Sequence, residues 1–516
     1  MRVRLLKLFA TSLFILFLPH LILAQTTNGS IRGTVTDQNG AVMPNAAVIV
    51  KNVETGFERR LTTREEGTYL ADNLPPGEYE IQIESRGFQK QLKRVTVLTS
   101  NSVELNFSLT VGASTETVVI TSDAAQVNTS DYKVDGVITR ERIENLPLNG
   151  RSFLSLASLE PGVDVEFNAN PGAGGVNNYF RVSIAGSTQT LTRISVDGAN
   201  VNDRITGGTA QNFSQETVQE FQISTFNFDL SVGNTSSGAV NIVSRTGGNQ
   251  FHGSGFYFFR DHNIAAFPAL RRPNDPSAFN PAYNNPDLRD SLVDPFFARR
   301  NTGVNLGGPI KKDRLFFFSN FEYTNQVGAQ TISFTNPLFA GFSHVGNLPF
   351  RGKLFNTRVD YRLNDKHNAY LRYSQDRNKN LAGGGNLEST WTSSNNYADQ
   401  TNLGVTSVLS SRWVNEFRVS YSFFSNQLRP PNEQECSNAL YCFNLNGPRI
   451  GGFGLTIGND NNVTQHRLLR TYQINENVYW NQGSHRIRFG GNWEHLYGHG
   501  SWARIYQGTF NLYSPE

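Results

Sequence analysis

The chain of 516 residues is poor in methionine and cysteine, with two of each, and its nine histidines lack the patterns of a metal or catalytic site. None of the histidines has a glutamate three residues later, so the H-x-x-E zinc pair of metallopeptidases is absent. The glycine-rich run at 451–458 lacks G-x-G-x-x-G spacing, and no nucleophile stands with a base. These absences argue against an enzyme, and we expect neither a cofactor nor a metal.

Long apolar runs are also missing after the first 24 residues. Residues 1–7 are basic, residues 8–18 are apolar, and Ala24 is a small residue suited to cleavage. The alternative, an inner-membrane anchor, needs roughly 20 apolar residues, and Pro19 interrupts the run before that length. Gln25 stands where lipid attachment would need a cysteine. We therefore expect residues 1–24 to be a cleaved secretory signal peptide.

The net charge of +3 is small for this length, so nothing favours nucleic acid as a partner. What the chain has in abundance is 37 phenylalanines, 18 tyrosines and 46 glycines, a composition typical of β-structure. The two cysteines, Cys436 and Cys442, lie close together in the polar loop CSNALYC. Because an exported chain meets an oxidising compartment, we expect a local disulfide. A metal site there could draw only on Glu433 and Glu435.

Between residues 28 and 111, short runs of alternating apolar and polar residues are separated by turn signals such as QNGA, EEGTY and LPPGEY. Short strands at regular spacing predict a small β-sandwich at residues 26–111. The stretches GTVTDQNGAVMPNAAVIVKN and GTYLADNLPPGEYEIQI resemble the carboxypeptidase regulatory-like family. That resemblance implies a structural or interaction module without peptidase activity.

The region 135–248 changes character, because apolar residues from Ile138 to Leu159 recur at short helical spacing and two small strands follow. Its motifs LPLNGRSFLSLASLEPGV, VDGANVND and GAVNIVSRTGGNQFHGS resemble, in this order, the plug of TonB-dependent outer-membrane transporters, most closely the Oar-like branch. The resemblance implies an α+β plug, in which Arg181, Asp197 and Asn200 could face a ligand. The alternative is a second soluble α+β domain.

From residue 249 to 516 the chain repeats strands that set an apolar and aromatic face against a polar one, as transmembrane β-barrels do. Residues 315–324 and 416–423 are examples. Connections alternate between short turns and long polar loops, which is typical of periplasmic turns and outside loops. We expect eight to ten strands, fewer than the roughly 22 of a plugged transporter barrel. This indicates a truncated barrel that does not insert and transport unaided.

The linker 112–134 contains the stretch ETVVI, followed by no turn and no second strand with which it could pair. In the resembled family the TonB box lies at this position, between the sandwich and the plug. A β-prone segment with no partner in its own chain can add to the sheet edge of another protein. The alternative is a last strand of the sandwich or a plain linker. The expected box comprises Glu116, Thr117, Val118, Val119 and Ile120.

The expected fold is therefore mainly β: a signal peptide, a small β-sandwich, an α+β plug and the N-terminal part of a transmembrane antiparallel β-barrel in the cell outer membrane. The resemblance implies import of a scarce, bulky extracellular ligand, with energy delivered by TonB, ExbB and ExbD. Outer-membrane lipid and lipopolysaccharide would be further partners. Two alternatives use the same scaffold: an Oar-like adhesion or secretion protein, and a SusC-like glycan importer.

Overall fold

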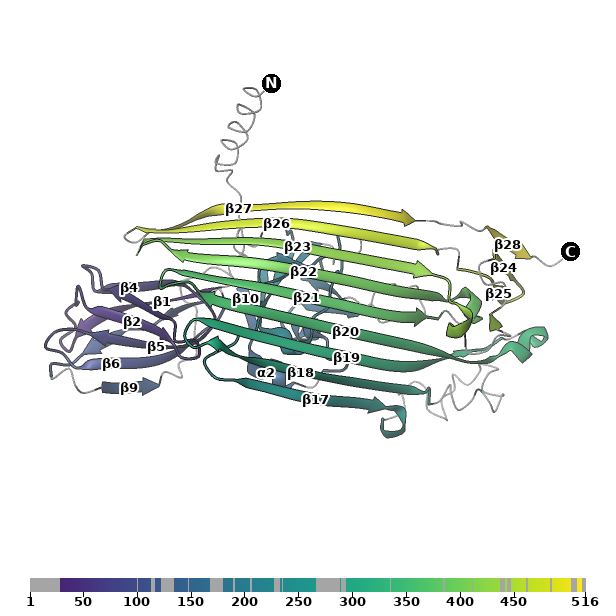
Figure 1. Ribbon diagram of the computed structural model, residues 1–516, viewed down its shortest axis with the longest axis horizontal. Helices are drawn as coiled ribbons and strands as arrows, with labels where there is room; N and C mark the ends of the chain where they lie inside the picture. Colours follow the sequence, from purple (N-terminus) through teal and green to yellow (C-terminus); the bar gives the residue numbers. More distant parts are fainter. Residues whose placement is uncertain are drawn as a thin grey trace, which may run out of the picture.

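The computed structural model describes twenty stretches of the chain, which form a sandwich (29–112), an inner domain (134–244) and a wall (252–502) (Figure 1). The described residues are 28–99, 101–112, 117–121, 134–146, 148–167, 180–188, 191–204, 207–226, 233, 235–265, 288, 294–334, 336–383, 386–410, 412–436, 441–442, 447–460, 463–482, 485–502 and 508–512. The expected signal peptide and Glu116 lie outside these residues.

The sandwich is formed by two β-sheets that enclose an apolar core. Its strands are β1 (Gly29–Asp37), β2 (Ala47–Asn52), β3 (Glu58–Thr62), β4 (Thr68–Leu74), β5 (Gly77–Glu84), β6 (Lys90–Val97), β7 (Ser102–Glu104) and β8 (Phe107–Leu109). One sheet has the order β4-β1-β7 with β8 also on β1, and the other contains β3-β2-β5-β6. Alternate residues such as Val48, Ile81 and Ile83 are fully buried between the sheets. The β-sandwich prediction is thus confirmed.

One expectation for the linker is wrong: residues 117–121 do have a partner strand in their own chain. They form β9 (Thr117–Thr121), which pairs in parallel with β6, with Gln91 opposite Val118 and Lys93 opposite Ile120. β9 thereby becomes the last strand of the sheet β3-β2-β5-β6-β9. Residues 117–121 thus form the alternative named above, a last strand of the sandwich, and their role as a TonB box stays a prediction. A parallel partner is joined through a longer connection and not through a hairpin turn, so no local sequence signal favours this alternative.

The inner domain contains a mixed sheet with the order β10-β15-β16-β13-β14 and a separate pair, β11-β12. Its elements are β10 (Val134–Ile138), α2 (Arg140–Asn145), η1 (Phe153–Leu159), β11 (Val163–Phe167), β12 (Phe180–Ile184), β13 (Thr192–Val196), β14 (Ala199–Asn200), η3 (Gln215–Thr217), β15 (Val218–Phe226) and β16 (Gly238–Ser244). Ile143 and Phe153 are buried in its core, as helical spacing predicts. Ile138 instead lies in strand β10, and Leu159 is exposed, so the helical pattern is shorter than expected.

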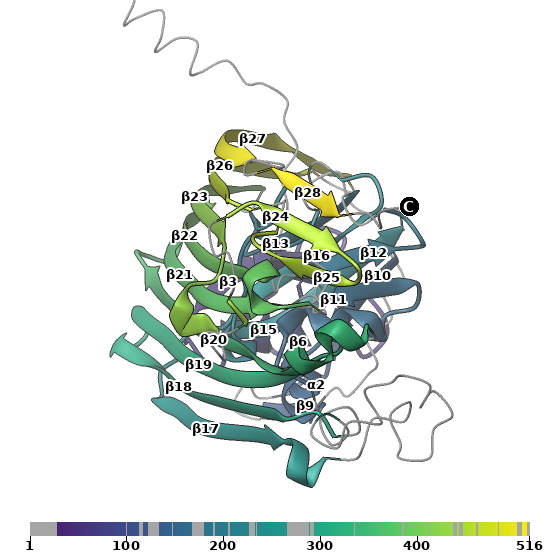
Figure 2. The same cartoon turned by 90° about the vertical axis from the view of Figure 1, so that its right-hand side faces the viewer.

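The wall is a nine-stranded antiparallel sheet in which each strand pairs with the next. Its strands are β17 (His252–Asp261), β18 (Phe297–Lys311), β19 (Leu315–Ile332), β20 (His344–Arg362), β21 (His367–Ala382), β22 (Thr392–Val408), β23 (Trp413–Arg429), β26 (Gln465–Gln482) and β27 (His485–Trp502). The sheet curves, and the inner domain lies on its concave side (Figure 2). The number of strands described agrees with the sequence expectation, but most are longer than the segments of about ten residues that are typical of barrel strands.

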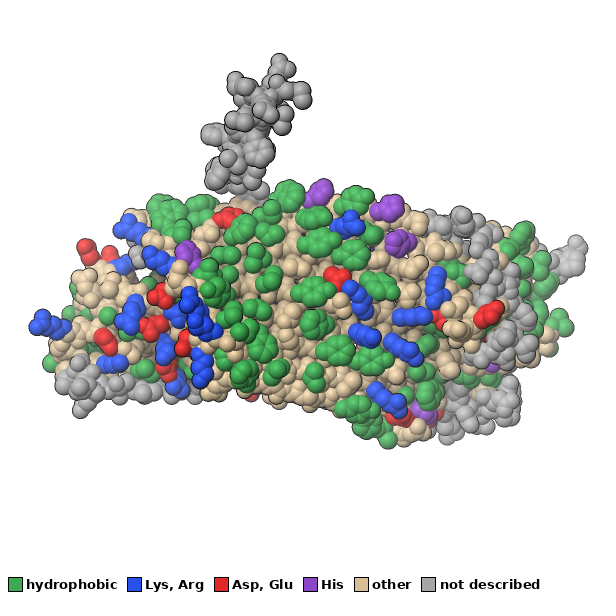
Figure 3. Space-filling model, in the orientation of Figure 1, with side chains coloured by type: hydrophobic (Ala, Val, Ile, Leu, Met, Phe, Trp, Pro, Cys, Tyr) green, Lys and Arg blue, Asp and Glu red, His purple; other side chains and the backbone are tan. Residues whose placement is uncertain are grey.

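The two faces of the wall differ in chemistry, as the alternation in the sequence predicts. On the convex face, apolar side chains such as Phe321, Leu371 and Trp493 are exposed. They form a broad green band between charged groups at both ends of the molecule (Figure 3). On the concave face, polar side chains such as Arg372 and Asn402 are fully buried. An apolar outer face and a polar inner face are what a strand between lipid and a lumen requires.

Short connections lie at the end of the wall next to the sandwich, and long connections lie at the other end (Figure 1). The long connections carry η5 (His262–Ile264), η9 (Pro337–Phe342), η10 (Glu388–Thr390), η11 (Glu433–Glu435) and a sheet of β24 (Arg449–Gly452), β25 (Leu455–Ile457) and β28 (Thr509–Leu512). None of the helices in the described stretches is both long and apolar enough to cross a membrane.

Candidate functional site

A cavity of about 540 Å³, the outer cavity, lies between the inner domain and the wall on the side of the long connections. The inner domain borders it with the segments 149–153 and 212–213, and the wall borders it with the ends of β18 to β21. Aromatic and amide side chains alternate in its lining, for example Phe180, Phe213, Phe350, Gln326, Asn378 and Asn380. Such a mixture offers apolar contact together with both donors and acceptors of hydrogen bonds.

The charged groups that line the outer cavity are already bound to other protein groups. Arg151 pairs with Glu216 at 2.8 Å and lies 3.6 Å from Glu322. Its guanidinium also lies 4.1 Å from the centre of the Phe256 ring, in cation–π contact with the wall. Arg299 donates to Gln326 at 2.7 Å. A ligand in this cavity therefore meets Arg151 and Glu322 as charges that already have charged neighbours. Arg299 instead meets it as a cation whose hydrogen-bond partners are amides, because Asn149 also accepts from it at 3.0 Å.

Arg151 links the inner domain to the wall, and the sequence analysis did not single it out. It lies within the motif LPLNGRSF, so the resemblance contained a signal for it. Its partner Glu216 is also contacted by Arg140 at 3.0 Å. Burial raises the pKa of Glu216, but the two guanidinium groups outweigh burial and hold this pKa below its usual value. Glu216 therefore stays ionised and can pair with Arg151, the residue that contacts the wall.

Asp197 forms an ion-pair cluster with two arginines of the wall. Its carboxylate lies 2.8 Å from Arg372 and 3.3 Å from Arg358, and it accepts hydrogen bonds from the backbone N–H and hydroxyl of Ser244. Asp197 has φ of 48°, a left-handed conformation that Asp and Asn adopt more readily than most residues. Burial raises the pKa of Asp197, but Arg358 and Arg372 together with Ser244 lower it below its usual value.

Of the three residues expected to face a ligand, Asp197 and Asn200 lie together in the β13–β14 hairpin and Arg181 lies on β12. None of the three lines the outer cavity. Asn200 is bound to the wall, because its N–H donates to Gln473 at 2.9 Å and its side-chain amide donates to Glu494 at 3.0 Å. Arg181 pairs with Glu166 at 3.5 Å on the neighbouring strand. These contacts favour a structural role for Asp197 and Asn200, and a ligand-facing role for the three residues stays a prediction.

A second cavity of about 220 Å³, the inner cavity, lies where the sandwich, the inner domain and the short-turn end of the wall meet. Tyr79 borders it from the sandwich, Asp197 from the inner domain and Arg362 from the wall. Beside this junction, Glu220 of the inner domain accepts two hydrogen bonds from Thr99 of the sandwich. Burial raises the pKa of Glu220 to about 7, although the bonds from Thr99 act to lower it.

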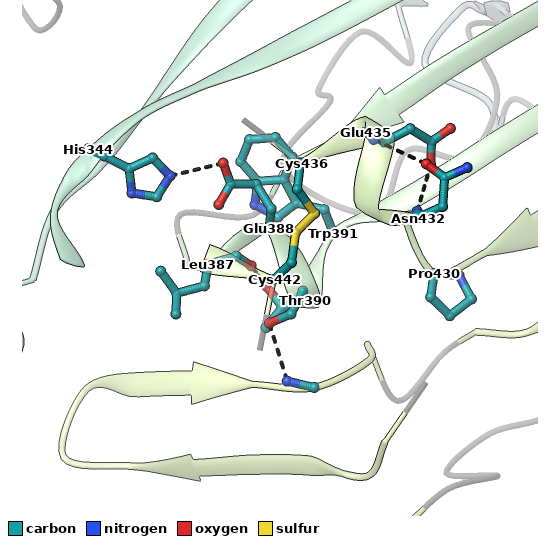
Figure 4. Close-up of a disulfide and its surroundings, with 12 residues drawn as sticks. His344, Leu387, Glu388, Thr390, Trp391, Pro430, Asn432, Glu435, Cys436 and Cys442 are labelled. Carbon is teal, nitrogen blue, oxygen red and sulfur yellow. Dashed lines mark hydrogen bonds and ion pairs between the residues drawn. A yellow bond between two sulfur atoms is a disulfide. The ribbon is translucent and has the colours of Figure 1, made fainter. Parts of the chain in front are cut away.

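The disulfide expected between Cys436 and Cys442 is present in the structure, with 6.3 Å between the Cα atoms (Figure 4). Glu435 does not form a metal site, because it pairs with Lys379 at 2.6 Å and with Arg429 at 2.7 Å. Burial raises the pKa of Glu435, but these two cations and a backbone hydrogen bond from Asn432 lower it to about 2. Across the described stretches, no group of three His, Cys, Asp or Glu side chains is arranged to hold a metal.

Comparison with known families accounts for most of the chain. Residues 30–110 match the family described as carboxypeptidase regulatory-like domain. Residues 243–348 and 338–515 match the family described as outer membrane beta barrel domain, and this match covers more than half of the chain. The chain belongs to the outer membrane beta barrel domain family.

Two curated relatives of this outer-membrane β-barrel protein agree with the two matches. The TonB-dependent transporter Oar of Myxococcus xanthus is 28% identical over 307 residues, which are 57% of this chain and 26% of Oar. Carboxypeptidase Z of Rattus norvegicus is 34% identical over 79 residues, which are 15% of this chain and 11% of that enzyme. The resemblances to the carboxypeptidase regulatory-like family and to the Oar-like transporters are therefore confirmed, and the identification of residues 135–248 as a plug stays a prediction. The outer-membrane β-barrel protein is located in the outer membrane and is a homologue of a TonB-dependent transporter.

A solved structure supports the same fold. The outer membrane transporter YddB from Escherichia coli is similar to this outer-membrane β-barrel protein with a TM-score of 0.55 and 10% identity, over 72% of this chain and 50% of that chain. At this identity the likeness shows the fold alone. The chain thus spans about a quarter of Oar and half of YddB.

Proposed function

We propose that this chain is part of a TonB-dependent outer-membrane transporter that binds a scarce, bulky ligand from outside the cell and is not an enzyme. The observation that carries the proposal is the inner domain on the concave side of the wall, held there by ion pairs such as Asp197 with Arg372. A pore that contains such a domain must be opened before anything bulky passes. The homology to Oar, named a TonB-dependent transporter, supports the same function.

The outer cavity is the ligand site in this proposal. In outer-membrane barrels the long loops face the outside and the short turns face the periplasm. The outer cavity lies on the long-loop side, so it would receive a ligand from outside, whereas the sandwich and β9 lie on the periplasmic side. Ligand binding at the outer cavity and TonB binding at the box would then be coupled across the inner domain.

Energy for opening would come from TonB with ExbB and ExbD, through the segment Glu116–Ile120. The segment has the β-branched composition that suits backbone pairing with a strand of another protein. A pull on this segment would act directly on β10, the first strand of the inner domain, which begins at Val134.

The box is tested in the full-length protein in its native outer membrane. A cysteine at Val118 should crosslink to a cysteine in the periplasmic domain of TonB. Val118→Pro should abolish both TonB capture and growth on limiting nutrient, because proline removes a backbone donor from the strand. Ala125→Pro, five residues beyond the box, is the matched control and should leave both intact. Growth that is unchanged in Val118→Pro would contradict import and favour adhesion or secretion.

The outer cavity is tested separately by filling it. Gly328 lines the cavity, and an added Cβ would meet only the Phe297 ring at 3.9 Å. Gly328→Trp should therefore be accommodated and should block ligand accumulation while TonB crosslinking persists. Gly341→Trp, in open space on a long loop, is the control. Growth under iron, glycan or peptide limitation should identify which nutrient depends on Gly328, and equal growth of both variants on all three would contradict this ligand site.

A further inference from the structure

The two outer edges of the second sandwich sheet differ in charge. At one edge, β3 (Glu58–Thr62) has the sequence ERRLT, with three charged side chains in five residues. At the other edge, β9 (Thr117–Thr121) has the sequence TVVIT, with no charge, no proline and no glycine. Proteins usually protect sheet edges with charged residues, proline or bulges, because an open edge can pair with another chain. β9 lacks each of these protective features.

The strand beneath β9 does carry such protection. β6 (Lys90–Val97) has the sequence KQLKRVTV, in which Lys90 pairs with Glu84 at 3.3 Å and Arg94 pairs with Glu80. Without β9 the sheet would end in this charged strand. Adding β9 therefore converts a protected edge into an unprotected one, made of five uncharged residues with strong β-propensity.

The chain leading into β9 is held against the sandwich. Gln89 N–H donates to the carbonyl of Thr110 at 2.9 Å, and Gly112 N–H donates to the carbonyl of Gly87 at 3.3 Å. Only residues 113–116 separate this attachment from Thr117. A tether of four residues gives β9 a high effective concentration at β6. Five parallel pairs, from Lys90–Thr117 to Arg94–Thr121, can therefore be maintained despite the modest strength of parallel pairing.

We propose that the sandwich is a scaffold that presents Thr117–Thr121 as an open edge strand, to which a strand of a partner protein adds while β6 holds the opposite side. The identity of the partner rests on the proposed function, and this partner is the periplasmic domain of TonB. β9 lies at the free margin of the sandwich, away from the inner domain and the wall (Figure 1).

Holding β9 on β6 before TonB binds reduces the conformational entropy that is lost on binding. A flexible segment must lose backbone conformational entropy at every residue when it becomes a strand. When β6 has already fixed β9 as a strand, the partner does not meet that cost, and this preorganisation strengthens binding. Successive residues of a strand direct their backbone groups alternately to the two sides, so β9 can pair with β6 and with a partner strand at the same time. The result is one continuous sheet across two proteins.

A disulfide between β6 and β9 tests the proposal in the full-length protein. Leu92 and Val119 are paired in register, so Leu92→Cys with Val119→Cys should oxidise to a disulfide. Lys90→Cys with Thr121→Cys joins opposite ends of the pairing and is the out-of-register control, which should not oxidise. The affinity for purified TonB periplasmic domain is then measured with and without reductant.

If the sandwich presents β9, the oxidised Leu92–Val119 variant should bind TonB at least as tightly as the reduced one. A loss of about tenfold on oxidation, restored by reductant, would show that the segment must leave β6 and would overturn the proposal. Failure of the matched pair to oxidise would also overturn it. Both outcomes are distinct from failure of the proposed function, in which the unlocked protein does not bind TonB or Val118→Pro binds it equally well.

A charge on the open edge provides a second test. Val119→Lys should weaken TonB binding by about tenfold or more, because a lysine protects an edge strand against pairing. Thr62→Lys, on the already charged β3 edge, should leave binding unchanged. Equal binding by wild type and Val119→Lys would overturn the proposal. Sedimentation of the same proteins without TonB shows whether two copies of this chain pair through β9, which would identify the edge as a self-association surface and also overturn it.

Discussion

The sandwich and the interface between inner domain and wall are stabilised by different kinds of interaction. The sandwich encloses a continuous apolar cluster in which Val48, Ile81 and Ile83 are fully buried. The interface instead buries charges in pairs, such as Asp197 with Arg372 and Asp203 with Arg467 at 2.9 Å. Apolar burial is non-directional, whereas a buried ion pair depends on both partners being in place.

This difference indicates which part of the molecule can open. Charged and amide groups that separate can be hydrated again, so most of this interface can form and break without exposing apolar surface. The apolar exception is the small cluster of Ala398, Phe424 and Leu469, against which Ala210 of the inner domain packs. An apolar core has no such alternative and resists opening until the domain unfolds. We therefore expect the inner domain to leave the wall while the sandwich remains folded, and substitutions in the two regions should report on different events.

Asp197→Asn should cause the largest loss of stability at the interface between the inner domain and the wall. Asparagine keeps the left-handed backbone and an acceptor for Ser244 but leaves Arg358 and Arg372 without their shared carboxylate. Removing one partner of a buried pair costs about 3 kcal/mol or more. Hydrogen exchange of the β16 amides should accelerate accordingly, with no change in the sandwich. Asp164→Asn, an exposed carboxylate of the inner domain, is the control, and equal acceleration in both variants would contradict the role of the cluster.

Glu220→Gln should have a smaller effect, and at high pH it should stabilise the contact between the sandwich and the inner domain instead of weakening an interface. The pKa of Glu220 is raised from 4.5 to about 7, so the folded chain binds this proton more tightly than the unfolded chain. The contact should therefore be strongest at low pH and should weaken as the pH rises from about 4.5 to about 7.

Glutamine removes this pH dependence and can still accept from the N–H of Thr99. At pH 8, Glu220→Gln should stabilise the contact by up to about 3 kcal/mol, and at pH 4 it should have little effect. Hydrogen exchange near Thr99 across this range measures the difference. A gain of the same size at both pH values would show that packing rather than ionisation is responsible.

Features with a local period were predictable from the sequence. The alternation that sets Phe321 against Glu322 gave the two faces of the wall, and the turn signals gave the sandwich strands. Long-range pairing had no such signal. The segment Thr117–Ile120 was expected to have no partner, with a last strand of the sandwich as an alternative. Its parallel pairing with β6 depends on how the sandwich folds, so the sequence could not decide between the two.

The candidate site was predictable only in part. Asp197 and Asn200 were predicted as possible ligand-facing residues of the inner domain. Nothing in the neighbouring sequence indicates that Arg372 and Gln473 from distant strands bind them. Arg151 was present in a quoted motif, yet its contact with Phe256 exists only because the inner domain docks against β17. Residues that line a cavity between two domains are determined by docking, which a single sequence does not reveal.

The smallest effect should come from Ile81→Val in the sandwich, and it sharpens the contrast with the interface. Ile81 is fully buried, and losing one methylene from such a site costs about 0.5–1.5 kcal/mol. Val53→Ala, at a site of the same domain that is 41% exposed, should cost less than about 0.5 kcal/mol. Hydrogen exchange should place the Ile81→Val loss in the β2 and β5 amides and leave those of β16 unchanged. Faster exchange in β16 would mean that the sandwich and the interface open together, and the separation between a rigid scaffold and a releasable inner domain would then be wrong.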